Sequence, residues 1–138
     1  MTSVPYRIMV ALVARGDERP VIKQAALYAK KFNAHLIAIH VNQPALSQPK
    51  GAVDQKLTKD DIQDRFIKYG FEDILDDVEI IIEYGESISK IINKYAHDID
   101  LIILGHRKQT NFRSRIMDSI DEGISNIASC PVLVVQKN

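Results

Sequence analysis

The chain has 138 residues, a length that suits one domain, and its 18 basic and 18 acidic side chains give a formal net charge of zero. This balance argues against nucleic acid or an anionic membrane as a partner, and the amino-terminal apolar run is too short for a signal peptide or a membrane span. A single cysteine, Cys130, excludes an intrachain disulfide and a cysteine-based zinc site, which fits a cytoplasmic protein.

The first elements along the chain are two strands with a helix between them. Residues 7–13 and 35–41 are short apolar runs typical of buried strands. The helix is expected to begin near Asp17 and Glu18, and its apolar residues recur at helical spacing: Ile22, Ala25, Ala26 and Ala29. Residues 42–57 contain prolines and little periodicity, and they predict a loop that is long for a compact domain and therefore either functional or mobile.

The middle of the chain predicts a helix, a strand and a further helix. The first of these is expected to begin near Thr58, since Asp60 and Asp61 would then lie in its first turn, where the helix dipole favours acids. Its predicted buried side is Ile62, Phe66 and Tyr69. Residues 78–83 form a third apolar run, which ends before Gly85. The next helix carries an apolar stripe at helical spacing: Ile88, Ile91, Ile92 and Tyr95.

The last part of the chain is the most informative for function. Residues 101–104 form a wholly apolar run that breaks at Gly105, as expected for a parallel strand covered on both faces. A basic loop follows, and Ser119 then opens a fourth helix with an inward face of Ile120, Ile124 and Ile127. Pro131 precedes a last strand, residues 132–135. A loop that leads from a strand into a helix N-terminus is where α/β proteins usually hold ligands, so this loop is the expected place for a small anion.

Strands that alternate with helices predict an α/β fold, a doubly wound parallel sheet of five strands with helices on both faces. Four segments, RIMVAL, AHLIAIHV, DLIILG and CPVLVV, resemble the universal stress protein family, and the resemblance covers nearly the whole chain. It implies one universal stress protein domain over residues 1–138, with an adenine nucleotide alpha hydrolase-like fold and the strand order 3-2-1-4-5. It also implies a homodimer through the last strand, and a role in stress or growth arrest.

Some members of this family bind ATP through the signature G-x2-G-x9-G-[S/T] after the fourth strand. On this chain the signature places Gly105 at the first glycine and Ser119 at the hydroxyl, but Lys108 and Asp118 at the other two glycines. Nucleotide-binding members also tend to have an aspartate where this chain has Val13. A backbone contact to adenine falls on Val41, where any residue would serve.

These departures make the chain similar to the universal stress protein A branch, which does not retain ATP and shares the pair Gly105-His106. A carboxylate at Asp118 would repel a phosphate at 4 Å by about 1 kcal/mol in water and about 4 kcal/mol near a protein surface. Lys108 acts in the opposite direction, but Asp118 and Val13 outweigh it. We therefore expect no bound cofactor, and ATP is the alternative.

The basic loop and the start of the fourth helix allow two interpretations each. Arg107, Lys108, Arg113 and Arg115 form either an anion site, with Arg107 and Arg115 as the contacts best suited to phosphate, or an ordinary solvated surface. Ser119 is either a ligand contact or the cap of a helix, since Ser119 and Glu122 form the capping-box pattern S-x-x-E.

The remaining reactive residue types form no convincing catalytic set. The four histidines show no metal-ligand spacing, and His40 and His106 are expected about 10 Å apart at the carboxyl ends of strands that flank the first strand. Cys130 is expected to be a small buried hydrophobe. We therefore expect a non-enzymatic cytoplasmic protein that acts on a protein partner, and the alternative is a nucleotide-binding regulator with weak or no ATPase activity.

The last strand suggests how the chain assembles. Under the order 3-2-1-4-5 it lies at one edge of the sheet, and its residues are all apolar: Val132, Leu133, Val134 and Val135. An apolar edge strand that begins with Pro131, and has no proline or lysine in its middle, invites pairing with a second copy. The alternative is that the preceding helix folds over this edge.

Overall fold

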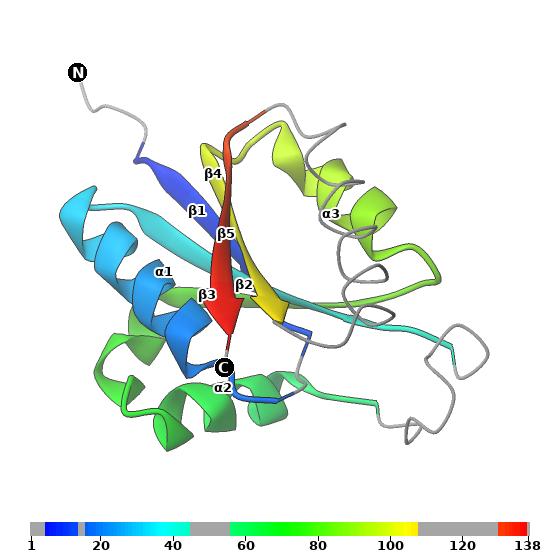
Figure 1. Ribbon diagram of the computed structural model, residues 1–138, viewed down its shortest axis with the longest axis horizontal. Coiled ribbons are helices and arrows are strands. Elements are labelled where there is room, and N and C mark those ends of the chain that lie inside the picture. The colour runs from blue at the N-terminus through cyan, green and yellow to red at the C-terminus, as the bar shows by residue number, and fades with distance from the viewer. Residues whose placement is uncertain (1–4, 14–15, 45–55, 108–129, 138) are drawn as a thin grey trace.

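A computed structural model of the chain describes residues 5–13, 16–44, 56–107 and 130–137. Five parallel strands form one sheet in the order β3-β2-β1-β4-β5 (Figure 1). The strands are β1 (Arg7–Ala11), β2 (His35–Asn42), β3 (Val78–Tyr84), β4 (Leu101–Arg107) and β5 (Val132–Lys137). The predicted fold class and strand order are therefore confirmed.

Helices cover both faces of this sheet. They are α1 (Arg19–Lys31), α2 (Lys59–Lys68), the short 3-10 helix η2 (Glu72–Asp77) and α3 (Ile88–Ala96). Figure 1 shows α1 and α2 on one side of the sheet and α3 on the other. The predicted fourth helix, with Ile120, Ile124 and Ile127, lies outside the described residues.

The core consists of two apolar layers, one on each face of the sheet. Ile8, Val10 and Leu12 pack with the buried residues of α1 and α2. Met9 and Ala11 belong to the opposite layer, with the isoleucines of α3. Successive side chains of a strand point to opposite faces, so a strand between two helix layers must be apolar at every position. This requirement explains the apolar run that follows Arg7 in the sequence.

The helix boundaries follow from local chemistry. Thr58 caps α2 in a capping box with Asp61, because the Thr58 hydroxyl accepts from the Asp61 N–H while the Asp61 carboxylate accepts from the Thr58 N–H. Pro20 lies in the first turn of α1, where a missing N–H costs no hydrogen bond. At the other end of α1, Asn33 has a φ of 50°, the left-handed conformation that ends many helices.

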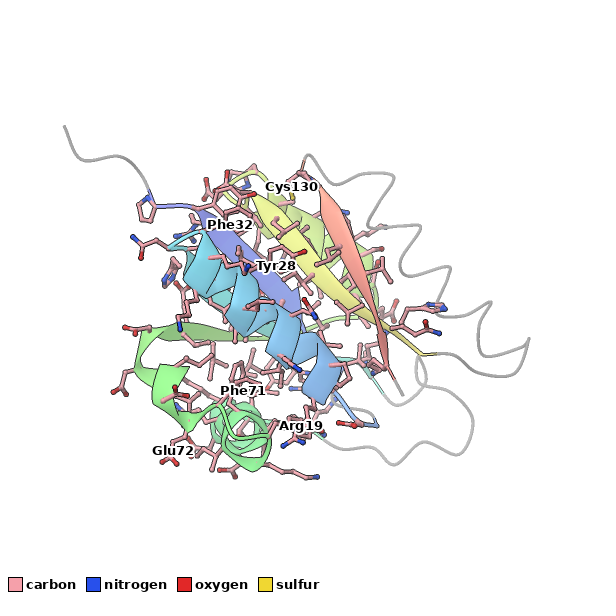
Figure 2. The ribbon with its side chains drawn as sticks, turned by 60° about the vertical axis from the view of Figure 1, so that its left-hand side comes forward. Arg19, Tyr28, Phe32, Phe71, Glu72 and Cys130 are labelled. Atoms are coloured by element: carbon pink, nitrogen blue, oxygen red, sulfur yellow. The ribbon has the colours of Figure 1, made fainter. Side chains whose placement is uncertain are left out.

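Aromatic side chains tie the end of α1 to the beginning of the sheet. The rings of Tyr28 and Phe32 stack with centroids 5.8 Å apart (Figure 2), and Tyr6, just before β1, lies 5.1 Å from Phe32. The Tyr6 carbonyl also accepts a hydrogen bond of 2.7 Å from the N–H of His35. These contacts fix the amino ends of the strands, opposite the edge where ligands are expected.

The strand ends differ from the sequence prediction. The prediction that the fourth strand breaks at Gly105 is wrong, because β4 continues to Arg107. The extra residues are paired with β5, with Gly105 opposite Val135 and Arg107 opposite Lys137. β1 is shorter than expected and ends at Ala11. No helix in the described part of the chain is long and apolar enough to cross a membrane.

Candidate functional site

The carboxyl ends of β1, β2 and β4 meet at one edge of the sheet, where we placed the expected ligand site. Ala11 lies opposite Ile39 of β2 and opposite Leu104 of β4. Two residues further along each chain segment are Val13, Val41 and His106, which lie beyond these paired positions at the same end of the sheet.

Of the residues proposed to contact an anion or nucleotide, the structure brings Val13, Val41 and Gly105 to this edge. Arg107 is described only through its backbone, as the last residue of β4. Lys108, Arg115 and Ser119 lie outside the described residues, as does Asp118. Their proposed contacts therefore remain predictions.

Gly105 is required by packing on the α1 side of the sheet. A Cβ at this position would lie 2.8 Å from Cγ2 of Val21 and 2.7 Å from Cδ of Lys137, closer than side chains normally approach. Val21 belongs to the first turn of α1, and the aliphatic part of Lys137 crosses from the neighbouring strand. The space over Gly105 on this side is thus filled by the protein itself.

Four polar or charged side chains are buried among the described residues: Glu18, His40, Asn42 and Lys137. Glu18 lies just before α1 and is only 1% exposed. One carboxylate oxygen of Glu18 accepts from the backbone N–H of Val13 at 3.0 Å, and the other accepts from Nη1 of Arg65 on α2 at 3.3 Å. The hydroxyl of Tyr69 lies 3.2 Å from the Glu18 N–H, which donates to it. The backbone donor at the end of β1 is therefore already used by a carboxylate.

His40 and Asn42 form the second part of this buried network. Nδ1 of His40 lies 2.7 Å from the carbonyl oxygen of Leu12, and Nε2 lies 3.2 Å from Oδ1 of Asn42. The Asn42 side chain also clamps the backbone of Leu57, accepting from its N–H at 2.9 Å and donating to its carbonyl at 2.8 Å. The network thus joins the ends of β1 and β2 to the residue that precedes the α2 cap.

Arg19 and Arg65 hold α2 against the start of α1. Arg19 begins α1 (Figure 2) and its guanidinium donates to the carbonyl of Tyr69 at 3.3 Å. Arg65 lies on α2 and forms the ion pair with Glu18, the buried partner in this interaction. The α2 region therefore contacts both Glu18 and the first residue of α1.

A family model described as the universal stress protein family matches residues 6–136 of this chain. The chain belongs to the universal stress protein family. Comparison with curated protein sequences gave no significant match.

Solved structures of universal stress proteins share this fold. One from Archaeoglobus fulgidus has a TM-score of 0.68 and 20% sequence identity, over 96% of this chain and 99% of that chain. A universal stress protein in complex with cAMP has a TM-score of 0.64 and 18% identity, over 96% and 98% of the two chains. A complex with dAMP from Archaeoglobus fulgidus has a TM-score of 0.58 and 19% identity, over 94% and 97%. At these identities the likeness concerns the fold alone.

Sequence reasoning about this universal stress protein missed the network around His40. The prediction considered only the distance between His40 and His106, but the two side chains belong to opposite faces of the sheet. His40 shares the face of Leu36 and Ala38, and His106 follows the alternation of β4 on the face of Leu104. A signal was present in the sequence, because Asn42 follows His40 by two positions and therefore shares its face.

The surroundings of Cys130 in this universal stress protein disfavour a reactive thiol. Cys130 lies half-buried at the start of β5 (Figure 2), where burial and then the charge of Asp100 raise the pKa of its thiol. A raised pKa disfavours the reactive thiolate. Within the described residues, no group of three or more histidine, cysteine, aspartate or glutamate side chains is placed to hold a metal ion.

Proposed function

We propose that this universal stress protein is a homodimeric, non-catalytic regulatory protein of the cytoplasm, which acts through a protein partner and does not retain ATP tightly. The observation that carries the proposal is the occupied end of β1. Val13 offers no polar side chain, and its N–H is bonded to the buried carboxylate of Glu18. A polar ligand therefore finds neither a polar side chain nor an unused backbone N–H of Val13 at this position.

A ligand that binds the Val13 N–H pays a free-energy cost for displacing Glu18. A ligand that takes the N–H of Val13 must displace Glu18, which is also bonded to Arg65. A buried carboxylate that loses its partners costs about 1–3 kcal/mol or more, and 1.4 kcal/mol is tenfold in affinity. The cost of breaking the bonds of Glu18 therefore disfavours a ligand at this strand end.

The alternative is a nucleotide-binding regulator with weak or no ATPase activity. It is favoured by the solved relatives described in complex with cAMP and with dAMP. Gly105 and Ser119 also keep the first and last positions of the family signature. Under this alternative, the basic residues after β4 would offset the missing glycines.

Calorimetric titration separates the two functions. The chain is titrated with ATP and magnesium, and in parallel with AMP and cAMP, after mass spectrometry of gently purified protein has shown whether a nucleotide is retained. We expect no retained nucleotide and no affinity tighter than about 100 μM, near −5.5 kcal/mol. We also expect Asp118→Gly to remain a weak binder, because Val13 and Lys108 are unchanged. A low-micromolar dissociation constant for the wild type would favour the alternative.

The two edge strands of the sheet support the proposed homodimer. The edge strand β3 carries an acid towards each end, with Glu79 bonded to His35 at 3.0 Å and Glu83 bonded to Tyr95 at 2.5 Å. The other edge strand, β5, is apolar from Val132 to Val135, and the side chain of Val134 is 45% exposed. Charged residues protect an edge from pairing, whereas an apolar edge favours it. We therefore propose that two copies pair through β5.

The backbone of β5 shows which substitution tests this pairing. The carbonyl of Pro131 accepts from Ile102 of β4, so odd-numbered residues of β5 direct their backbone groups to β4. Val134 then directs its N–H away from β4, and Val134→Pro removes this donor while leaving the ladder to β4 intact. Val134→Thr is the matched control, because it keeps the N–H and the branched shape.

Light scattering at tens of micromolar measures the result. We expect a dimer for the wild type and for Val134→Thr, and a monomer for Val134→Pro. A monomeric wild type, or a dimeric Val134→Pro protein, would contradict pairing through β5.

A further inference from the structure

The outer side of α1 carries only positive charge. Residues 19–31 contain no aspartate or glutamate. The exposed residues of α1 follow one another along one side of the helix, and they are Arg19, Lys23, Leu27, Lys30 and Lys31. Leu27 lies in the middle of this row and is 42% exposed. These five residues form the basic stripe.

The neighbouring elements α2 and η2 are acidic on their outer side. On α2 the exposed residues Asp60, Asp64 and Ile67 recur at helical spacing, and Ile67 is 44% exposed. All four acids of η2 are exposed as well. Residues 59–77 contain seven acidic and three basic residues. The exposed acids of α2 and η2, together with Ile67, form the acidic patch.

The charges of these two surfaces are not paired with each other within one molecule. Two of the three basic residues near the acidic patch have other contacts, since Arg65 pairs with the buried Glu18 and Nζ of Lys68 lies 5.7 Å from the centroid of the Tyr69 ring. None of the ion pairs in the described part of the chain joins the basic stripe to the acidic patch. Both surfaces can therefore meet charges of a second molecule.

Helix stability explains only part of this charge pattern. Cations near a helix C-terminus are favoured, which accounts for Lys30 and Lys31 in the last turn of α1. Arg19 instead lies in the first turn, where a cation is disfavoured, and Lys23 follows it as a like charge at i+4. An exposed leucine in the middle of the basic stripe gains nothing from the helix dipole. Recognition by another surface accounts for both features.

The basic stripe and the acidic patch lie on the same face of the molecule. Figure 1 shows α1 and α2 on one side of the sheet, and both helices pack on the same core layer. Arg19 marks the end of α1 that adjoins α2 (Figure 2), and its guanidinium donates to the carbonyl of Tyr69. A two-fold axis in the plane of this face, between the two surfaces, would place the basic stripe of each copy opposite the acidic patch of the other.

We propose that this α1–α2 face is a second self-association surface, separate from β5, on which two copies of the chain pair through opposite charges around Leu27 and Ile67. The contact is self-complementary, because each copy supplies both charged surfaces. Exposed ion pairs contribute little each, so the association is weak, with a dissociation constant of roughly 0.3 mM. The surface therefore responds to the local concentration of the protein and to ionic strength.

Sedimentation equilibrium of the wild type tests this association. We expect the average mass to rise by about half between about 30 μM and about 1 mM protein in about 50 mM salt, and to rise much less in about 500 mM salt, where charges are screened. The mass at low concentration reports pairing through β5, so failure of that pairing is distinguishable from failure of this one. A constant mass up to about 1 mM protein at low salt would overturn the proposal.

Paired charge reversals test the complementarity. Lys23→Glu with Lys30→Glu cancels the charge of the basic stripe, and Asp64→Lys with Asp76→Lys cancels that of the acidic patch. We expect each double variant to self-associate at least about tenfold more weakly than the wild type. An equimolar mixture of the two should regain association, because one variant keeps its acids and the other keeps its cations. A mixture that associates no better than its components would overturn the two-fold contact.

The control and a vesicle assay separate this contact from other effects of charge. Lys90→Glu with Lys94→Glu changes the net charge as much as the α1 variant does, but on exposed positions of α3, on the opposite side of the sheet. We expect it to associate like the wild type, and an equal loss would overturn the proposal. Vesicles of phosphatidylcholine and phosphatidylglycerol are the second probe. Binding to these vesicles by a wild type that does not self-associate would assign the basic stripe to an anionic membrane and overturn the proposal.

Discussion

Replacing Gly105 with alanine tests whether this glycine is kept for packing. The new Cβ would lie 2.8 Å from Cγ2 of Val21 and 2.7 Å from Cδ of Lys137. The Lys137 stem can rotate, but Val21 is 0% exposed and lies in the first turn of α1. The contact with Val21 is therefore relieved only by a shift of α1 or of β4.

The expected loss follows from two opposing effects. Overpacking a well-packed core costs about 1–3 kcal/mol, whereas replacing glycine inside a strand regains about 0.5–1 kcal/mol of backbone entropy. We expect Gly105→Ala to lower the free energy of unfolding by about 0.5–2 kcal/mol and the melting temperature by about 2 to 8 °C. Gly85→Ala is the control, because its Cβ would meet mainly Cδ1 of Ile91, the end of a side chain that can rotate. We expect that control to change stability by less than about 0.5 kcal/mol.

Urea unfolding of the single and double variants measures the contact itself. Val21→Ala alone should cost about 2 kcal/mol, because two buried methyl groups are lost. In the double variant the methyl group of Ala at position 105 occupies the vacated space, so the loss should be smaller than the sum by about 1 kcal/mol. Additive losses, or a Gly105→Ala protein as stable as the Gly85→Ala control, would refute the packing argument.

Three further predictions concern side chains outside this contact. Thr58→Ala should lower the free energy of unfolding by about 1 kcal/mol in urea, since α2 loses its cap and Asp61 loses the partner that lowers its pKa; no loss would contradict the capping role. The hydrogen bond to Glu83 raises the pKa of Tyr95 to about 12, so its stabilising effect is present below pH 10 and lost as the pH rises towards 12. Absorbance titration should show Tyr95 ionising last, and Tyr95→Phe should remove that final step; an unchanged curve would contradict it. Cys130 should react with a thiol reagent at pH 8 more slowly than a free cysteine, because its thiol pKa is raised.

The fold was predictable because the pattern of apolar residues indicates strands that alternate with helices. The apolar run that follows Arg7 in the first strand required a layer on each side, and β1 does contribute alternately to both core layers. The α2 start at Thr58 was predictable from the acids that follow it. The end of β4 was not predictable, because a glycine usually ends a strand. Pairing with β5 extends β4 past Gly105 to Arg107.

The positions of the strand ends were predictable, but the chemistry around them was not. Parallel strands place Val41 and Gly105 at the carboxyl-end edge, and the register agrees, with Val13 just beyond the end of β1. The buried network of Glu18 and His40 was missed, because Glu18 had an adequate local explanation as a helix-starting residue. Its bonds to Val13 and Arg65 depend on tertiary packing, which local patterns do not contain.

The Asn42 clamp also affects how the length of this protein can vary during evolution. Asn42 and Leu57 are 15 positions apart, yet the side chain of one holds both backbone groups of the other. The side chain of Asn42 therefore joins the two ends of the intervening segment. Because doubling the length of a closed loop costs only about 0.6 kcal/mol, this chain should accept an inserted peptide tag, or even a small domain, between these positions. Natural relatives are expected to differ in length here more than at the tight connection between β3 and α3.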